Sequence, residues 1–138
     1  MSVYLDASIL LRIVLGQPKQ LEGWRKLETG VASALTEVET LRALDRLRLT
    51  ADLDETDLAE RRRLVYALTE EMELVEVTRP ILDRAAGAFP VTLGTLDAIH
   101  LSTALAWQEA RQEDLTLATH DRRLASAARA VGLEVIGA

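Results

Sequence analysis

Near the start of this 138-residue chain stands Val3-Tyr4-Leu5-Asp6-Ala7-Ser8, the run that says most about its fold. Three apolar residues, which favour a short buried strand, lead straight into an aspartate, and the apolar run Ala7 to Leu15 then favours a helix. The same order returns where Leu115 to Ala118 is followed by Asp121. Strands that alternate with helices indicate parallel pairing, because each connecting helix crosses a face of the sheet.

The rest of the chain continues this alternation. Pro80 fits the first turn of a helix, and Gly132 fits the position at which a helix ends. We therefore expect one α/β domain over residues 1–138, with a short, mainly parallel sheet of about four to five strands flanked by helices. The further strands are expected at Val31–Ala34, Met72–Val77 and Glu134–Ile136, and the further helices at Gln20–Glu28, Thr36–Leu49, Asp57–Glu71, Thr78 to about Gly87, Thr95–Arg111 and Asp121–Val131, with a loop over Thr50–Asp57.

Composition narrows the class of protein. The chain is 49% hydrophobic and 28% charged, which is ordinary for a globular protein, and it has no apolar run of the ~20 residues needed to cross a membrane. It contains no cysteine, so disulfides and thiolate metal sites are excluded and a reducing cytoplasm is expected; the N-terminus shows no basic leader. The net charge of −6 argues against binding nucleic acid by overall attraction, although metal ions and arginines can reverse the field within one cleft.

Four acidic residues lie where parallel strands would bring them together. Asp6 and Asp121 follow expected strands, and Asp97 begins an expected helix. Glu39 borders the apolar stripe of another helix, so its carboxylate should be half-buried. The carboxyl ends of parallel strands open on one crevice, and two like charges ~4 Å apart repel by about 4 kcal/mol at an effective dielectric of 20, so the group requires a cation. Oxygen ligands without cysteine favour Mg²⁺ or Mn²⁺ over zinc.

Simpler explanations exist for each acid taken alone. Asp6, Asp97 and Asp121 could each cap a helix, where aspartate accepts hydrogen bonds from free N–H groups. Glu39 could form an exposed ion pair with Arg42, three residues later, which is worth only ~0.3 kcal/mol. These alternatives stay open until the positions of the side chains are known.

The two histidines have structural interpretations. His100 lies one helical turn after Asp97 and is expected either to pack in the core or to hold a metal ligand in place. His120, beside Asp121, is expected at the surface.

The four acids also stand in motifs of a known family. Val3–Ser8 resembles the hydrophobic run, aspartate and Ser/Thr opening of PIN domains, especially the VapC toxins of bacterial toxin–antitoxin pairs. Residues 36–44, around Glu39, are similar to the second acidic motif, residues 96–104 look like the third, and residues 119–124 resemble the last. The resemblance runs from Val3 to Val135, with one departure at Ala7, where many relatives carry a second hydroxyl residue.

The resemblance implies a single PIN-like domain and an endoribonuclease that depends on Mg²⁺ or Mn²⁺, whose charge would activate a water against an RNA phosphodiester. It also implies the toxin of a type II toxin–antitoxin pair, with RNA as substrate, a cognate antitoxin as inhibitor, a homodimer as assembly and no membrane partner. The implied site consists of Asp6 and Asp97 as direct metal ligands, Glu39 and Asp121 as acids that complete the shell or act through water, and Ser8 and Thr119 as residues that orient carboxylates or phosphate.

Basic residues near the acids are candidates for contacts with RNA phosphates, with a solvated helix face or an ion pair as the alternative for each. The run Arg61-Arg62-Arg63 is expected on a solvated helix face. The segment Leu47–Leu68 could instead form part of a dimer or antitoxin surface. The candidate RNA contacts are Arg12, Arg42, Arg46 and Arg122.

Other classes of α/β protein compete with this interpretation. A receiver-like signalling domain would need paired acids at the first strand and a lysine after a late one, but the only lysines are Lys19 and Lys26. A dehalogenase-type phosphatase would show Asp-x-Asp after the first strand, whereas Asp6 is followed by Ala7 and Ser8. A catalytically idle α/β binding module is the remaining alternative.

Overall fold

The computed structural model describes residues 1–50 and 53–138. Its described parts form a five-stranded sheet with every strand pair parallel and the strand order β3-β2-β1-β4-β5, which confirms the α/β fold class expected from the sequence. The chain winds outward from the central β1 through β2 to β3, then crosses to the other side of β1 and continues through β4 to β5. The strands are β1 (Ser2–Leu5), β2 (Thr29–Ser33), β3 (Glu73–Val75), β4 (Leu115–Ala118) and β5 (Glu134–Ile136).

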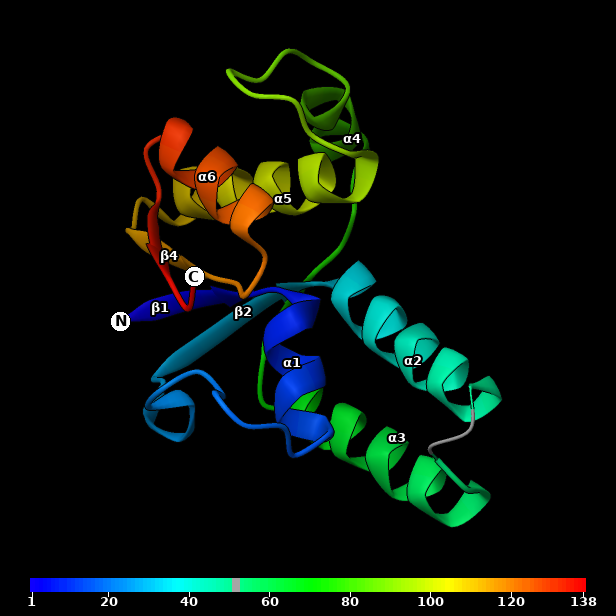
Figure 1. The fold of residues 1–138 in the computed structure, drawn as a ribbon. Coiled ribbons are helices and arrows are strands. Elements are labelled where there is room, and N and C mark those ends of the chain that lie inside the picture. The colour runs from blue at the N-terminus through cyan, green and yellow to red at the C-terminus, as the bar shows by residue number, and fades with distance from the viewer. Residues whose placement is uncertain (51–52) are drawn as a thin grey trace.

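Helices cover both faces of the sheet (Figure 1). Helices α1, α2 and α3 lie on one face and pack against one another, while α4, α5 and α6 lie on the other, where α5 contacts both of its neighbours. Because both faces are covered, the central strands are apolar almost throughout. The helices are α1 (Ala7–Val14), α2 (Ala34–Leu49), α3 (Glu55–Glu70), α4 (Arg79–Ala85), α5 (Thr95–Arg111) and α6 (Arg122–Ala130).

Alternate residues of β1 enter two different layers of the core. Tyr4 packs in the layer that contains Leu101 of α5 and Leu117 of β4, whereas Val3 and Leu5 belong to the layer that contains the buried side chains of α1. This period of two is the geometry of a strand buried on both faces. It places the Tyr4 side chain on the α5 side of the sheet.

Local chemistry begins and ends several helices, and Pro80 and Gly132 take the positions that the sequence predicted. The side chain of Ser33 accepts a hydrogen bond from the Leu35 N–H (3.1 Å) at the start of α2, and Asp54 caps α3. Pro80 lies in the first turn of α4. Gly132 follows α6 with a φ of +89°, a conformation that glycine adopts without strain.

The prediction of a helix over Gln20–Glu28 is wrong. The structure has only a 3₁₀ turn there, η1 (Trp24–Lys26), because Gly23 has a left-handed conformation (φ +73°) that interrupts a continuous helix. Strand β2 begins directly after this segment, at Thr29. The loop expected over Thr50–Asp57 includes residues 51 and 52, which lie outside the described residues.

A second correction concerns Arg61, which was expected on a solvated face. Its side chain donates a hydrogen bond to the Val14 carbonyl (2.8 Å) and is half-buried, so it satisfies the C-terminal end of α1. No helix within the described ranges has the length and hydrophobicity needed to span a membrane.

Candidate active site at the carboxyl edge of the sheet

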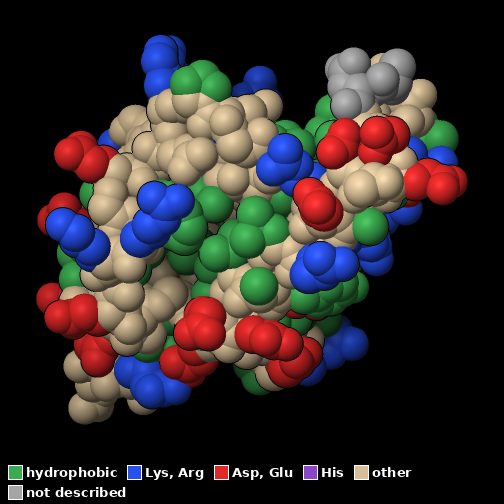
Figure 2. All heavy atoms as spheres, turned by 90° about the horizontal axis from the view of Figure 1, so that it is seen from below, with side chains coloured by type: hydrophobic (Ala, Val, Ile, Leu, Met, Phe, Trp, Pro, Cys, Tyr) green, Lys and Arg blue, Asp and Glu red, His purple; other side chains and the backbone are tan. Residues whose placement is uncertain are grey.

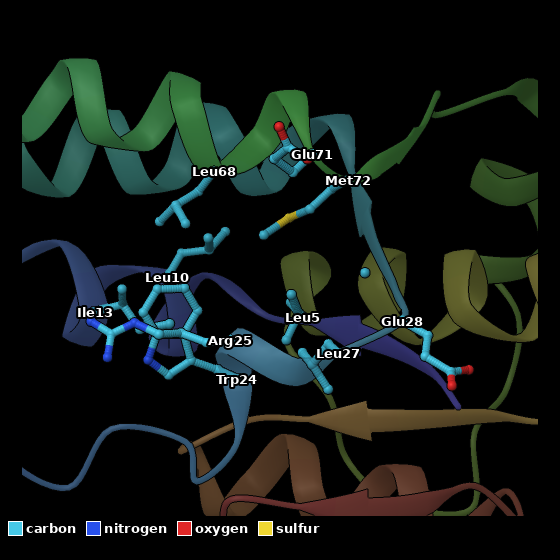
Figure 3. A pocket seen from close by; sticks show the side chains of 11 residues that line it. Leu5, Leu10, Ile13, Trp24, Arg25, Leu27, Glu28, Leu68, Glu71 and Met72 are labelled. Carbon is cyan, nitrogen blue, oxygen red and sulfur yellow. The ribbon is translucent and has the colours of Figure 1, made fainter.

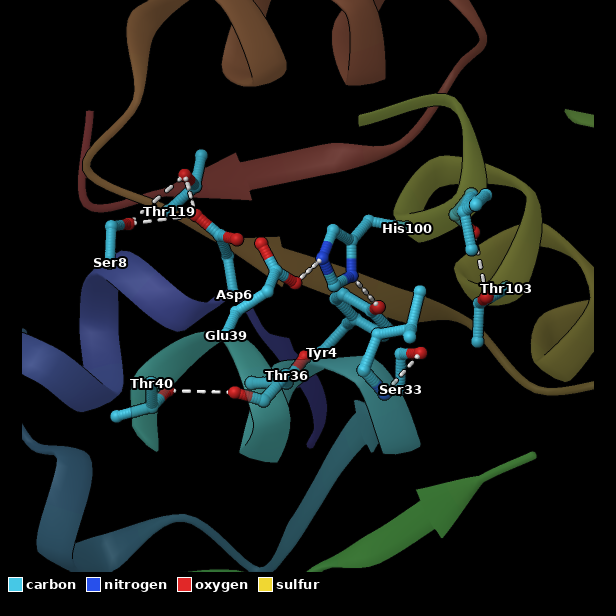
Figure 4. Close-up of polar contacts among 12 residues, drawn as sticks. Tyr4, Asp6, Ser8, Ser33, Thr36, Glu39, Thr40, His100, Thr103 and Thr119 are labelled. Carbon is cyan, nitrogen blue, oxygen red and sulfur yellow. Dashed lines mark hydrogen bonds and ion pairs between the residues drawn. The ribbon is translucent and has the colours of Figure 1, made fainter. Parts of the chain in front are cut away.

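The site begins with Asp6, the first residue after the central strand. Asp6 is only 7% exposed, and its Oδ2 accepts hydrogen bonds from Ser8 Oγ and Thr119 Oγ1, each at 2.8 Å. Although Asp6 occupies the N-cap position of α1, its side chain makes no capping hydrogen bond, so the capping explanation is wrong for this residue. Figure 4 shows the Asp6 carboxyl group pointing toward that of Glu39.

Hydrogen bonds join the end of β1 to the end of β4. The Asp6 N–H donates to the Ala118 carbonyl (3.1 Å), and the His120 N–H donates to Ser8 Oγ (2.9 Å). Thr119 is fully buried, and its hydroxyl both donates to Asp6 and accepts from the Asp121 N–H (3.0 Å). The strand order reverses between β1 and β4, which is where open α/β sheets bind their ligands.

Asp121 caps helix α6, as the simpler explanation predicted. Its Oδ1 accepts hydrogen bonds from the N–H groups of Arg123 (2.8 Å) and Leu124 (3.4 Å). The neighbouring His120 is partly exposed, and its Nδ1 donates to the Gly137 carbonyl (2.9 Å). Of the two carboxylate oxygens of Asp121, Oδ1 thus accepts hydrogen bonds from α6, whereas Oδ2 makes no hydrogen bond among the described residues.

Glu39 of α2 is held in the site by a histidine. Its half-buried carboxylate accepts a hydrogen bond from His100 Nε2, and His100 Nδ1 lies 2.6 Å from the Tyr4 hydroxyl. Arg42 pairs with Asp45 (3.1 Å), so the alternative of an exposed Glu39–Arg42 ion pair is wrong. The sequence did not identify Tyr4 as part of the site. The strand pattern indicates that its side chain is buried, but it does not indicate that its hydroxyl contacts His100 of α5.

Burial and the nearby acids change the proton affinity of Tyr4 and His100. Burial, reinforced by the charge of Asp6, raises the pKa of the Tyr4 phenol well above 10.0, so the hydroxyl keeps its proton. Burial alone would lower the pKa of His100, but the hydrogen bond to Glu39 and the charges of Glu39, Asp6 and Asp97 outweigh it and raise that pKa. Three of the acids thus act on one buried ring.

Asp97 lies in the first turn of α5 and is half-buried. The N-cap residue of this helix is Gly94, and the Asp97 carboxyl makes no hydrogen bond among the described residues. Burial, and then the charges of Asp121 and Asp6, raise the pKa of Asp97, and the charge of Glu39 adds to the effect. The four acids therefore share one electrostatic environment at the carboxyl edge of the sheet.

The donor set suits a hard divalent cation, although the side chains stand apart. Within residues 1–50 and 53–138, no three acidic or histidine side chains lie close enough together to coordinate one ion. The chemistry nevertheless fits Mg²⁺ or Mn²⁺, because the donors are carboxylate oxygens. Burial and then the charges of Asp121 and Asp6 raise the pKa of Asp97 by more than the charge of His100 lowers it, so the site carries a net negative field. The residues available to hold such an ion are Asp6, Glu39, Asp97 and Asp121.

Two of the four candidate arginines border the site. Arg42 and Arg46 line a groove of about 490 Å³ between α1 and α2, together with Ser8 and Glu39. Arg12 donates to the Lys19 carbonyl (3.1 Å) and is held against the segment after α1. Arg122 is exposed at the start of α6. The apolar residues that line the groove are Ala7, Leu11, Leu35, Val38, Ala43 and Leu96.

A second hollow lies away from the acids. Figure 2 shows hydrophobic side chains gathered in the middle of one face, with acidic and basic side chains around them. A cavity of about 330 Å³ is lined mainly by apolar side chains from β1, α1, the segment around η1 and the end of α3 (Figure 3). The charged residues of its lining are Arg25, Glu28 and Glu71, and none of the four acids belongs to it. The reactive groups therefore gather at the carboxyl edge and not in this cavity.

Sequence comparison points to one family. The family model described as PIN domain matches residues 3–130. Ribonuclease VapC46 of Mycobacterium tuberculosis is 35% identical over 98% of this chain and 96% of its own length. Ribonuclease VapC47 of the same species is 29% identical over 94% of this chain and 92% of its own length.

Solved structures share the fold. A toxin–antitoxin complex from Klebsiella pneumoniae aligns with a TM-score of 0.68 and 14% identity over 97% of this chain and 95% of that chain. VapBC2 from Rickettsia felis, bound to a DNA fragment from its promoter, aligns with a TM-score of 0.68 and 14% identity over 98% of this chain and 97% of that chain. At such identities the likeness concerns the fold alone.

Proposed function

This chain belongs to the PIN domain family, and from that membership and the acidic crevice we propose that it is a divalent-metal-dependent endoribonuclease. It cleaves RNA phosphodiesters by hydrolysis and acts in the cytoplasm as the toxin of a type II toxin–antitoxin pair. Residues 1–138 act as one domain, and the chain assembles as a homodimer. The two ribonucleases that resemble it over nearly its whole length support the reaction.

The observation that carries the proposal is the environment of Asp6. A buried carboxylate needs a compensating charge or hydrogen bonds, because its desolvation costs several kcal/mol. Two hydroxyls fix one oxygen of Asp6, the side chain does not cap α1, and the described residues include no ion pair to it. Asp97, which makes no hydrogen bond among the described residues, contributes to the same negative field. A hard cation is the partner that this arrangement fits.

The roles follow from the contacts of each side chain. When bound, a divalent ion supplies positive charge to the phosphodiester and lowers the pKa of an attacking water. Asp6 and Asp97 hold the ion, and Ser8 and Thr119 keep the Asp6 carboxylate in one orientation. Glu39 and the oxygen of Asp121 that does not cap α6 complete the acidic set or act through water.

The groove between α1 and α2 suits both RNA and an antitoxin. Arg42 and Arg46 stand beside Glu39 in this groove, where they can meet the phosphates of a bound strand, and Arg122 stands next to Asp121. Val38 and Leu96, also in the groove lining, are 53% and 49% exposed. Apolar side chains this exposed beside a reactive site favour a protein partner that covers them. The solved toxin–antitoxin structures that share this fold support an antitoxin as that partner.

The direct test is RNA cleavage by purified protein with Mg²⁺ or Mn²⁺. Asp6→Asn and Asp97→Asn should each reduce cleavage to the level seen with EDTA, while leaving the fold intact. Asp114→Asn is the matched control, because Asp114 is an exposed aspartate at the opposite edge of the sheet, directly before β4. Full cleavage by either site variant would exclude the assignment. Calorimetric titration that detects no Mn²⁺ binding near neutral pH would favour a catalytically idle binding module.

A further inference from the structure

One buried ring connects the elements that carry three of the acids. His100 belongs to α5, one turn after Asp97. Its Nδ1 lies 2.6 Å from the hydroxyl of Tyr4, which stands in β1 two residues before Asp6, and its Nε2 contacts Glu39 of α2. Figure 4 shows the ring between the Tyr4 and Glu39 side chains. The imidazole of His100 therefore links its own helix, α5, to β1 through Tyr4 and to α2 through Glu39.

The direction of the hydrogen bond to Glu39 follows from simple valence. An ionised carboxylate can only accept, so Nε2 carries a hydrogen and donates it to Glu39 whether or not the imidazole is charged. The Tyr4 hydroxyl can pair with Nδ1 in either case, because a phenol both donates and accepts. Both ring nitrogens are satisfied, and the His100 side chain is only 1% exposed, so water does not compete for these contacts.

The contact restrains a side chain that would otherwise be mobile. Glu39 has three rotatable side-chain bonds and is 25% exposed, and among the described residues its carboxylate accepts a hydrogen bond from His100 alone. Without that donor the carboxylate could turn toward solvent, and binding an ion would then require the side chain to be ordered again. Partners that orient metal ligands typically change metal affinity by about 10- to 100-fold.

We propose that His100, fixed by the Tyr4 hydroxyl, is a positioning residue that orients the Glu39 carboxylate toward Asp6 and thereby sets the affinity of the acidic site for a divalent cation. This inference rests on the proposed function. The competing explanation is that His100 only fills and satisfies the core, in which case its replacement would lower stability but leave metal affinity unchanged.

Two amide substitutions separate these explanations. The amide nitrogen of glutamine lies at about the position of Nε2 of histidine, whereas that of asparagine lies at about the position of Nδ1. His100→Gln therefore keeps a donor for Glu39, and His100→Asn keeps only a group that faces Tyr4. Both replace the ring by a smaller polar amide, so a purely structural role predicts similar behaviour from the two variants.

The experiment measures Mn²⁺ dissociation constants by calorimetry and by the electron paramagnetic resonance of free Mn²⁺, with thermal unfolding in EDTA as the folding control. We expect His100→Asn to bind Mn²⁺ about 10- to 100-fold more weakly than the wild type, and His100→Gln to bind within about threefold of it. Equal affinities of His100→Asn and the wild type, or equal losses in both variants, overturn the inference.

Tyr4→Phe keeps the test decisive if His100→Asn does not fold, because it removes only the hydroxyl that faces Nδ1. Because the donor to Glu39 stays in place, Tyr4→Phe should weaken Mn²⁺ binding less than His100→Asn does, and unchanged binding overturns the inference. The losses from His100→Asn and Glu39→Gln should also be non-additive in the double variant, since one acts through the other. If the folded wild type binds no Mn²⁺, the proposed function itself is refuted. If the wild type and His100→Asn bind Mn²⁺ equally, only the inference about His100 is refuted.

Discussion

Replacing Thr119 by valine should destabilise the protein and release the Asp6 carboxylate together. Thr119 is fully buried, and its hydroxyl donates to Asp6 Oδ2 at 2.8 Å and accepts from the Asp121 N–H at 3.0 Å. A hydrogen bond to a charged group contributes about 1.5–3 kcal/mol, and an N–H left unpaired costs ~1 kcal/mol more. Because Ser8 still donates to the same oxygen of Asp6, we expect a loss around the lower end of that summed range, about 2–3 kcal/mol.

For a chain of this length, that loss corresponds to a fall in Tm of about 6–12 °C. Calorimetry in EDTA at neutral pH measures the stability, and RNA cleavage with Mg²⁺ measures the function, which should fall about 10- to 100-fold as Asp6 loses its orientation. Thr119→Ser is the matched control, because it keeps the hydroxyl and removes one methyl group; it should retain most of the cleavage. Equal Tm values for the two variants, or full cleavage by Thr119→Val, would refute this account of the site.

Three further outcomes are expected. The folded protein holds the Asp97 proton more tightly than the unfolded chain, so Asp97→Asn should raise the metal-free unfolding free energy at neutral pH, and this gain should shrink toward zero as the pH falls to the ordinary pKa of 3.8 and below. No gain at neutral pH would contradict the raised pKa of Asp97. Arg61→Ala should lower the unfolding free energy in urea by about 1–2 kcal/mol through the lost bond to the end of α1, and the exposed Arg63→Ala should change it little; equal losses would count against the bond. Arg46→Gln should reduce the slope of log affinity for RNA against log salt concentration by about 0.7–1, whereas Arg12→Gln should leave the slope unchanged. The reverse ranking would show that RNA does not bind along the groove.

Much of the fold follows from local patterns in the sequence. The parallel sheet was predictable because short apolar stretches alternate with segments of helical period along the chain, and both signals depend on residues only a few positions apart. Pro80 and Gly132 likewise mark the start of one helix and the end of another through local backbone preferences. Local reasoning failed at Gln20–Glu28, where the apolar spacing of a helix is present but Gly23 adopts a left-handed conformation. It also misjudged Arg61, whose acceptor lies on another helix.

The acids themselves could be found in the sequence, since strand ends and motif spacing mark Asp6, Glu39, Asp97 and Asp121. The sequence could not show which of these acids cap helices and which do not. Capping was an equally good explanation for the three aspartates, and the structure separates them: Asp121 caps α6, while Asp6 and Asp97 do not cap their helices. The difference arises from where each carboxyl group points, which depends on the packing of neighbouring elements.

Sequence alone determined the order of strands and helices and the types of residue that stand at their ends. Only the tertiary structure decided which of those residues meet. The hydrogen bond from Thr119 to Asp6 joins positions 113 apart, the contact of Tyr4 with His100 joins positions 96 apart, and that of His100 with Glu39 joins positions 61 apart. No local period encodes such partners, because they come together only when β1 pairs with β4 and when His100 of α5 reaches Glu39 of α2 at the carboxyl edge of the sheet.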